Sequence, residues 1–243
     1  MSYGIFSEFY DRFMSSADYE KRADYILSLF NKFDRMPTLM LDVGCGTGTF
    51  TKIFTDRSID VIGADPSEDM LNIAREKCPD ALFLCQAGNE LDLYGTVDGA
   101  VSCMDSLNHI TDYTELLETF RKVSLFLEKD RLFIFDLNSE YKHRELLGDN
   151  AYTFEDDDVF CAWQNYTDEN LLTEEYLDFF KKSEGGKYAR YTDYITEKCY
   201  NVKEIEKIAR DSDFEVLAIY DDLSYNKPEI TSDRLYFVLR KGK

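Results

Sequence analysis

Hydrophobic positions along the chain change their spacing several times, and each change predicts a different kind of element. Apolar residues three or four positions apart predict one helix near the N-terminus and a second helix from Tyr19 to about Phe33. Thr38–Val43 follows as a short, almost fully apolar run. Such a run is typical of a strand that is buried on both faces of a parallel sheet.

The alternation of strand and helix continues through the first half of the chain and returns near its C-terminus. Further strands are predicted at Asp60–Ala64, Ala81–Cys85, Val97–Cys103, Arg131–Leu137, Phe214–Tyr220 and Arg234–Arg240. The intervening helices are predicted at Ser67–Cys78, about Tyr113–Glu128 and Val202–Asp211. Short connections between alternating strands and helices indicate βαβ units. We therefore predict an α/β fold with a doubly wound, mostly parallel, seven-stranded sheet.

The stretch from about Ala151 to Tyr200 breaks this rhythm. Period-two alternation and turn-like segments predict three antiparallel strands, at Phe160–Gln164, Leu171–Lys181 and Tyr188–Tyr200. We expect a Rossmann-like domain formed by residues 1–150 and 201–243, with an inserted antiparallel β subdomain at residues 151–200. The many aromatic side chains of the insert either form the core of its own sheet, cover an acceptor pocket as a lid, or make a homodimer contact.

Charge and composition narrow the class of partner. The 243 residues include 28 lysines and arginines against 48 aspartates and glutamates, which gives a net charge of −20. A surface of this charge repels phosphate backbones and anionic lipid headgroups, so we expect neither nucleic acid nor membrane as a partner. The six cysteines form no Cys-x-x-Cys pair, and only two histidines are present. This pattern favours buried thiols in a reducing cytoplasm and argues against a zinc site.

The chemically most informative feature is the glycine-rich loop Gly44–Gly48, which links the first buried strand to a helix. Glycines allow the backbone to approach a ligand closely, and the helix N-terminus adds free N–H groups and a positive dipole end. Asp65 ends the next strand, where a carboxylate can accept both hydroxyl protons of a ribose. Together these residues predict a nucleoside-binding site.

The spacing of the glycines separates two kinds of nucleoside cofactor. The dinucleotide fingerprint requires glycine at position 49, where this chain has Thr49. Asp42 stands two residues before the loop. It would repel a pyrophosphate, whereas it would favour a ligand that carries an amino group and a sulfonium. An NAD-dependent oxidoreductase is the alternative, which a dinucleotide titration would test.

Three segments resemble the class I S-adenosylmethionine-dependent methyltransferases. Leu41–Thr51 (LDVGCGTGTFT) is similar to motif I of that family, and Asp65-Pro66-Ser67 with Met70 is similar to its ribose-binding segment. Val97–Asn108 resembles the fourth-strand motif. More narrowly, the chain resembles small bacterial methyltransferases with an antiparallel β insertion after the fifth strand. The resemblance implies transfer of a methyl group from S-adenosylmethionine to an O, N or C atom of an acceptor, and the charge favours a small molecule.

The resemblance also implies a set of cofactor-binding residues. The methionine part of the cofactor would lie along the backbone of Gly44, Cys45 and Gly46. Asp42 would shape this loop and its electrostatics. Asp65 would bind the ribose hydroxyls. The remaining implied positions are Pro66 and Met70 near ribose and adenine, Gln86, Ala87 and Gly88 at the adenine edge, and Met104 and Asp105 after the fourth strand. Many relatives carry an acid at the place of Ala87.

Two residues are candidates for a catalytic role. Tyr10 lies on the predicted N-terminal helix, where it would close over the cofactor or belong to the core. His109 follows the fourth strand, and its ordinary pKa near neutrality suits a general base, although a structural role at a helix start is the alternative. Because no base is evident beyond these two, a cofactor-binding regulatory protein without catalysis is the rival interpretation.

Overall fold

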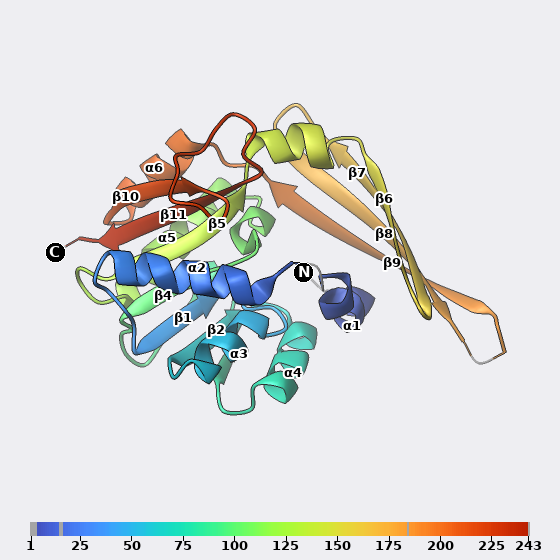
Figure 1. Ribbon diagram of the computed structural model, residues 1–243, viewed down its shortest axis with the longest axis horizontal. Coiled ribbons are helices and arrows are strands. Elements are labelled where there is room, and N and C mark those ends of the chain that lie inside the picture. Colours follow the sequence, from blue (N-terminus) through green and yellow to red (C-terminus); the bar gives the residue numbers. More distant parts are fainter. Residues whose placement is uncertain (1–3, 15–16, 184, 243) are drawn as a thin grey trace.

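The computed structural model describes residues 4–14, 17–183 and 185–242, without the side chains of residues 4–6 and 8. Its main sheet is built from β1 (Leu39–Val43), β2 (Asp60–Asp65), β3 (Leu82–Cys85), β4 (Gly99–Ser102), β5 (Leu132–Asn138), β10 (Phe214–Asp221) and β11 (Arg234–Lys241). The strand order is β10-β11-β5-β4-β1-β2-β3 (Figure 1). The five neighbouring strands β3, β2, β1, β4 and β5 pair in parallel. At the other edge, β11 pairs antiparallel with β5, and β10 pairs antiparallel with β11. The predicted doubly wound, mostly parallel sheet of seven strands is confirmed.

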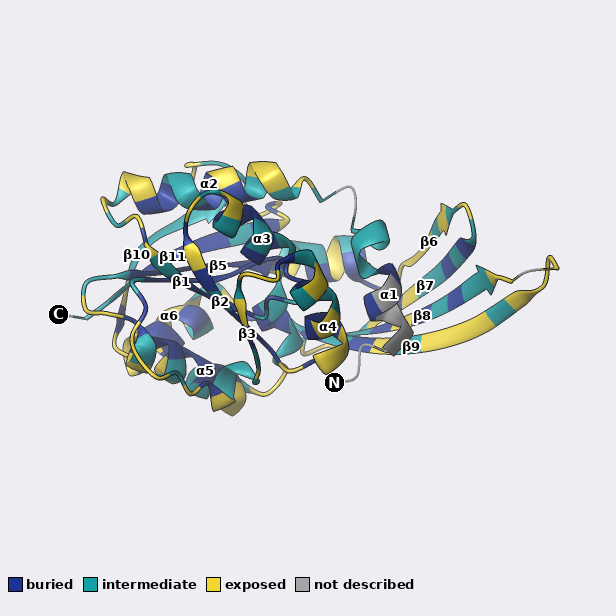
Figure 2. Cartoon of the chain, turned by 90° about the horizontal axis from the view of Figure 1, so that it is seen from below, coloured by how far each residue is buried: buried dark blue, intermediate teal, exposed yellow. Residues whose placement is uncertain are grey.

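Helices cover both faces of this sheet. They are α2 (Tyr19–Lys32), α3 (Thr49–Asp56), α4 (Glu68–Lys77), α5 (Tyr113–Phe126) and α6 (Val202–Asp211). Alternate residues of β5 separate the two layers: Phe133 packs with α5 and α6, and Ile134 packs with α2 and α3 (Figure 2). All seven residues of β5 are buried. A central strand with helices on both faces is mostly apolar, and in β5 only Asp136 and Asn138 are polar.

A second sheet projects from one end of the main sheet (Figure 1). It consists of β6 (Ala151–Asp156), β7 (Val159–Thr167), β8 (Leu172–Lys182) and β9 (Tyr188–Lys198), all paired antiparallel in chain order. Three of these strands were predicted, and β6 was missed. None of the six β6 residues is buried, so the strand lacks the buried apolar face that would have marked it in the sequence.

The N-terminal helix α1 (Gly4–Phe13) lies between the small sheet and α4 (Figure 1). The Phe9 ring stacks on Phe179 of β8 with 5.4 Å between the ring centroids. Arg12 forms ion pairs of 2.7 Å with Asp156 and Asp158 at the first hairpin of the small sheet. On its other side, α1 contacts α4. The helix therefore links two parts of the chain that are far apart in sequence.

Candidate active site

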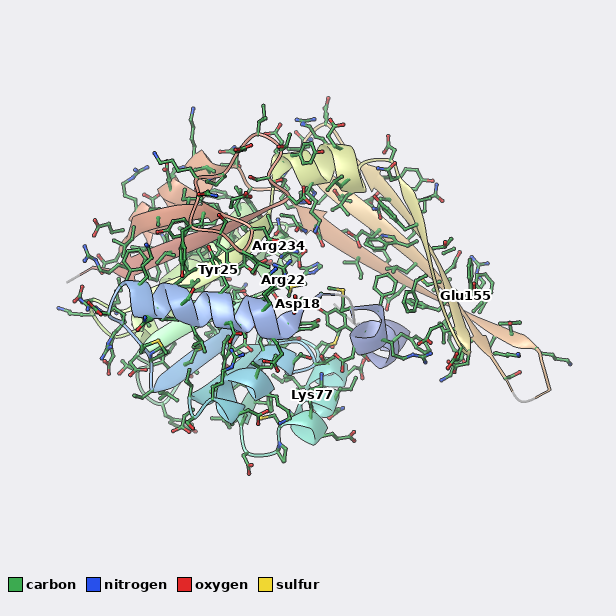
Figure 3. The ribbon with its side chains drawn as sticks, in the orientation of Figure 1. Asp18, Arg22, Tyr25, Lys77, Glu155 and Arg234 are labelled. Carbon is green, nitrogen blue, oxygen red and sulfur yellow. The ribbon has the colours of Figure 1, made fainter. Side chains whose placement is uncertain are left out.

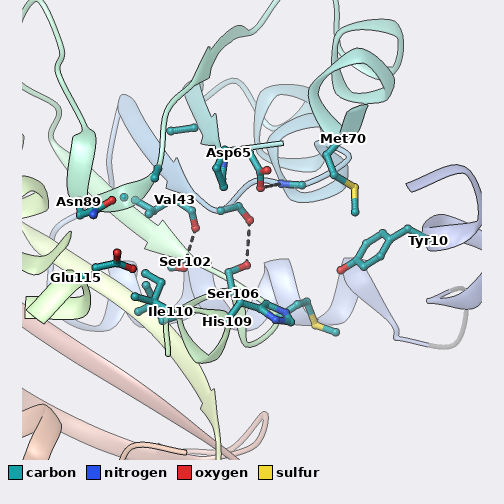
Figure 4. Close-up of a pocket in the computed structure, with 18 residues that line it drawn as sticks. Tyr10, Val43, Asp65, Met70, Asn89, Ser102, Ser106, His109, Ile110 and Glu115 are labelled. Atoms are coloured by element: carbon teal, nitrogen blue, oxygen red, sulfur yellow. Dashed lines mark hydrogen bonds between the residues drawn. The ribbon is translucent and has the colours of Figure 1, made fainter. Parts of the chain in front are cut away.

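A cavity of about 250 Å³ opens at the carboxyl ends of β1, β2 and β4 (Figure 4). Ligand sites of open α/β sheets occur at this edge. Ten residues singled out from the sequence line it: Tyr10, Gly44, Gly46, Asp65, Pro66, Met70, Ala87, Gly88, Met104 and His109. In the close-up, Tyr10 and Met70 lie at one end of the cavity, and Asn89 and Glu115 lie at the other.

The glycine loop takes a backbone conformation that only glycine adopts without strain. Gly44 has a φ of 71°, and a Cβ atom there would lie 2.7 Å from the Cβ of Ser106. The Ser106 hydroxyl donates a 3.0 Å hydrogen bond to the carbonyl oxygen of Gly44. At Gly46, by contrast, a Cβ atom would meet nothing within 4 Å. The loop is thus held against the segment after β4, with its open side toward the cavity.

Asp65 is oriented by two backbone groups. The N–H of Gly46 donates to its Oδ2 at 3.0 Å, and the N–H of Ser67 donates to its Oδ1 at 2.8 Å. Burial raises the pKa of Asp65, and these two N–H groups oppose that shift. Each carboxylate oxygen keeps further lone-pair capacity, since an ionised carboxylate offers about four acceptor positions. The side chain is therefore fixed in place and can still accept hydrogen bonds from a ligand.

The wall after β4 is a strained turn. Met104 and Asp105 both have a φ of 56°, in the left-handed region that residues with a Cβ atom rarely adopt. Asp136 of β5 accepts from both of their N–H groups, at 2.8 Å and 3.0 Å. The Arg234 side chain, labelled in Figure 3, pairs with Asp136 and lies 3.1 Å from Asp105 Oδ2. This buried network holds the turn in the conformation that the cavity requires.

Four of the residues implied by the resemblance do not line this cavity. Asp42 is buried behind the loop, where the Thr51 hydroxyl donates to it at 2.7 Å. The Cys45 side chain packs into the core beside α4. Gln86 accepts from the N–H of Asp92 and lines a different hollow, because it follows the edge strand β3. The Asp105 carboxylate turns away toward Arg234 and toward Asn138, whose amide donates to it at 2.6 Å.

Other lining residues escaped the sequence reasoning. Asn89, Ser106 and Glu115 supply polar side chains to the cavity. Asn89 lies in a short 3-10 turn (Gly88–Glu90) directly after the predicted Ala87-Gly88 pair, so its position was within reach of the sequence. Glu115 lies in the first turn of α5, and only the folded chain brings it to the same cavity.

The charge of the lining selects the kind of ligand. Asp65 and Glu115 contribute two carboxyl groups, and no lysine or arginine lines the cavity among the residues that the structure describes. A pyrophosphate would lack a cationic partner here. S-adenosylmethionine carries a sulfonium and an ammonium, and its ribose offers two hydroxyl donors, so the donor and acceptor set fits this cofactor.

The fold and this lining define a nucleoside-binding α/β protein, and comparisons with known proteins identify its family. A family model described as a methyltransferase domain matches residues 40–129. A protein of Geobacillus sp. (strain WCH70), provisionally named a methyltransferase, is 30% identical over 99% of this chain and 100% of its own. YqeM of Bacillus subtilis (strain 168), also provisionally named a methyltransferase, is 29% identical over 100% of this chain and 98% of its own.

Solved structures agree with this relationship. A crystal structure of an S-adenosylmethionine-dependent methyltransferase from Clostridium acetobutylicum ATCC 824 covers 99% of both chains, with a TM-score of 0.89 and 29% identity. S-adenosylmethionine-bound CalS10, an amino pentose methyltransferase from Micromonospora echinaspora, shares the fold, with a TM-score of 0.75 and 16% identity over 92% of each chain. The chain belongs to the S-adenosylmethionine-dependent methyltransferases, and S-adenosylmethionine is its cofactor.

The described part of the chain holds neither a membrane-spanning helix nor a metal-ligand cluster. No helix there is both long and apolar enough to cross a membrane. No group of three or more His, Cys, Asp or Glu side chains in the same residues could hold a metal ion. Five of the six cysteines are buried, whereas Cys85 is exposed, which differs from the expectation that all six thiols are buried. Cys85 ends the edge strand β3, where no further strand covers it.

Asp42 makes the stability of the fold depend on pH. Burial, together with the nearby charge of Asp65, raises its pKa from 3.8 to about 7, although the Thr51 hydroxyl opposes the shift. A carboxyl group whose pKa is higher in the folded chain contributes most stability at low pH, and it loses that contribution as pH rises toward 7. An Asp42→Asn variant mimics the protonated form, so its stability should fall less on the alkaline side.

Urea unfolding at about pH 5.5 and about pH 8 measures this effect. Between the two pH values, we expect the free energy of unfolding of the wild type to fall by about 1–2 kcal/mol more than that of Asp42→Asn. Asp60→Asn, at the exposed start of β2, is the control and should follow the wild type. Equal pH dependence of Asp42→Asn and the wild type would show that Asp42 is ionised throughout this range.

Proposed function

We propose that this methyltransferase binds S-adenosylmethionine in the cavity at the carboxyl ends of β1, β2 and β4 and methylates a small molecule. The observation that carries the proposal is the lining of the cavity: an oriented carboxylate, a second carboxyl group and no lysine or arginine among the described residues. When bound, S-adenosylmethionine supplies an activated methyl group. The contribution of the protein is to orient the reactants and exclude water.

Individual residues are assigned roles within this proposal. Asp65 accepts the ribose hydroxyls, and Gly44 and Gly46 allow close approach of the backbone. Asn89 offers an amide at the end of the cavity where Ala87 has no polar group. Tyr10 on α1 closes the opposite end. Asp42, Cys45 and Asp105 act from behind the wall, through the shape of the loop and of the turn.

His109 is the candidate for moving a proton. It lines the cavity, and its Nδ1 lies 3.3 Å from the carbonyl oxygen of Thr196. Because a carbonyl oxygen only accepts, Nδ1 carries the proton in the neutral ring. Nε2 is then the basic nitrogen, and it can take a proton from an acceptor whose reactive atom must lose one.

We infer a small acceptor and assign the β6–β9 segment to its site. α1 contributes Tyr10 to the lining of the cavity, and β9 contacts both α1 and the turn Ser106–His109 beside the cavity. Proteins similar over part of this chain are named for small acceptors, as is the dTDP-3-amino-3,4,6-trideoxy-alpha-D-glucopyranose N,N-dimethyltransferase of Streptomyces venezuelae, 33% identical over 41% of this chain. Residues 151–200 would then form the acceptor subdomain, and residues 1–150 and 201–243 the cofactor domain. The six free cysteines support a reducing cytoplasm as the compartment.

Calorimetric titration with S-adenosylmethionine, S-adenosylhomocysteine and NADH tests the cofactor site. We expect binding of both adenosyl compounds and none of NADH. Turnover of S-adenosylmethionine is then assayed with a cell extract divided by size into metabolites and macromolecules. Turnover with the metabolite fraction supports a small acceptor. Turnover only with RNA or protein overturns it, and binding without turnover in any fraction favours the non-catalytic rival.

A further inference from the structure

A cluster of buried hydrogen-bond acceptors lies at the base of the small sheet. Glu175 of β8 is 5% exposed, and Glu197 of β9 is 6% exposed. Asn165 of β7 is fully buried and pairs directly with Glu175, so the two side chains share one face of the sheet. Thr173 pairs directly with Glu197 and stands two residues from Glu175, which places both glutamates on that same face. Burial raises the pKa of Glu175, and the neighbouring carboxyl group of Glu197 raises it further.

In the described part of the chain, the basic groups closest to the two glutamates are histidines: His109 Nε2 and His143 Nε2 lie 4.0 Å and 3.9 Å from the Glu197 carboxyl group. No lysine or arginine there forms an ion pair with either carboxyl group, although two cations lie nearby. Lys142 donates to Asn138 Oδ1 at 2.8 Å and lies 3.8 Å from Asp105 Oδ2. Arg234 pairs with Asp105 and Asp136, as described above. Lys142 and Arg234 therefore make their closest contacts with other acids, and Lys142 and His109 compensate the glutamate pair only in part.

His143, which lies in the π-helical turn Lys142–Leu147, adds an unpartnered acceptor that is independent of the acids. Its side chain is fully buried, and its Nε2 has no hydrogen-bond partner and lies 3.9 Å from Glu197 Oε2. Its Nδ1 lies 2.8 Å from the Thr173 hydroxyl, which lies 2.9 Å from the Thr167 hydroxyl. The Thr167 hydroxyl donates to backbone carbonyl oxygens, so it accepts from the Thr173 hydroxyl. The Thr173 hydroxyl in turn accepts from His143 Nδ1, which therefore carries the proton. Nε2 therefore presents a lone pair toward Glu197.

Asn165 presents a second unpartnered acceptor. Its amide nitrogen donates to the carbonyl oxygen of Leu147 at 3.4 Å, which fixes the orientation of the amide. Its Oδ1 is buried without a hydrogen-bond partner. Burial lowers the pKa of His143 to about 4, so that ring is neutral and contributes no charge. The cluster therefore combines two carboxyl groups, an imidazole lone pair and an amide oxygen. The Asn138 amide donates a hydrogen bond to it, at 2.8 Å from Glu197 Oε2.

An unpartnered buried acceptor marks a place where a bound water or a ligand supplies a donor. An ammonium group carries one positive charge and several N–H donors, so it can ionise and pair with the carboxyl groups and also supply the missing hydrogen bonds. The cluster also borders the cofactor cavity, since His109 lines that cavity and its Nε2 lies 4.0 Å from Glu197 Oε1. A molecule anchored at the cluster would extend toward the reaction centre.

We propose that Glu175 and Glu197, with His143 Nε2 and Asn165 Oδ1, bind a cationic amine group of the methyl acceptor. The substrate class is therefore a small amine-bearing molecule, and this inference rests on the proposed function. The glutamates anchor the charge, and the two neutral acceptors set the direction of the N–H groups.

The test uses the full chain saturated with S-adenosylhomocysteine and titrated by calorimetry with cyclohexylamine and with the neutral isostere cyclohexanol. Thermal unfolding in ammonium chloride against equal sodium chloride supplies a smaller probe. The variants Glu175→Gln and Glu197→Gln keep the side-chain volume and remove the charge. Glu174→Gln, on the exposed face of the same strand, is the matched control.

We expect the wild type to bind cyclohexylamine and not cyclohexanol, and to gain thermal stability in ammonium chloride. Either glutamine variant should bind the amine about tenfold or more weakly, while Glu174→Gln should match the wild type. The comparison of amine with alcohol in the wild type needs no variant to fold. Normal binding of S-adenosylhomocysteine with equal or absent binding of the two probes would overturn this inference alone. Failure to bind S-adenosylhomocysteine would overturn the proposed function, and the inference with it.

Discussion

Replacing Arg234 by methionine is expected to lower the free energy of unfolding by about 3–5 kcal/mol, because breaking a buried ion pair leaves uncompensated charge. The Arg234 side chain is 7% exposed and pairs with Asp136, which is 1% exposed, and with Asp105. Burial raises the pKa of Asp105, but Arg234 and Lys142 outweigh it and hold that pKa below its usual range. Without Arg234, both carboxyl groups would lose most of their compensation.

The same variant should loosen the cavity wall. Asp136 accepts from the N–H groups of Met104 and Asp105, whose left-handed backbone is strained. Once Asp136 loses its cation, rotation of its carboxyl group would release the turn. We therefore expect Arg234→Met to weaken binding of S-adenosylhomocysteine as well as to destabilise the fold.

Urea unfolding followed by circular dichroism measures the loss, and Arg240→Met is the matched control on the same strand. Arg240 pairs with Glu215 at 2.5 Å near the surface, so its removal should cost about 1 kcal/mol or less. A double variant that adds Asp136→Asn to Arg234→Met should recover part of the loss. Equal losses for Arg234→Met and Arg240→Met would show that the buried network contributes no more than a surface pair.

The second large effect is expected at the cofactor. Asp65→Ala should weaken binding of S-adenosylmethionine and S-adenosylhomocysteine by about 1.5–3 kcal/mol, which is roughly tenfold to a hundredfold in affinity. The reason is the loss of a carboxylate that Gly46 and Ser67 hold toward the cavity. Hydrogen bonds to charged groups contribute more than those between neutral groups.

Two further variants separate the causes. Asp65→Asn keeps the shape and removes the charge, so it should retain an intermediate affinity. Asp60→Ala, at the exposed start of the same strand, should bind both compounds as the wild type does. Affinity is measured by calorimetry on variants whose thermal unfolding has been recorded. If Asp65→Ala bound S-adenosylmethionine and S-adenosylhomocysteine with unchanged affinity, the assignment of this cavity to the cofactor would be wrong.

The fold was predictable to the extent that its elements are locally encoded. The mostly apolar runs at Thr38–Val43 and Arg131–Leu137 predicted the buried strands β1 and β5, because a strand covered by helices on both faces carries few polar residues. Ser67, the first residue of the predicted helix Ser67–Cys78, caps α4 by accepting a hydrogen bond from the N–H of Met70. The strand β6 was not predictable in this way, because its mostly exposed residues form a strand only beside β7.

The candidate site divides along the same line. Gly44, Gly46 and Asp65 follow directly from strand ends and turn chemistry, which are properties of short segments. The family resemblance implied that Gln86 lies at the adenine edge, whereas its side chain lines a different hollow beside the edge strand β3. Asn89 and Glu115 reach the cavity from separate elements, and the sequence holds no local signal for the second of them.

The sequence by itself determined the doubly wound sheet, the loop at its carboxyl edge and the class of cofactor, because each depends on residues close together in the chain. The tertiary structure alone decided which distant charges meet. Arg234 reaches Asp105 across 129 positions, and Asn165, Glu175 and Glu197 join only when three strands pair in register with a buried His143 beside them. Electrostatic partners of this kind are set by packing and burial, and neither is encoded in the pattern of any single segment.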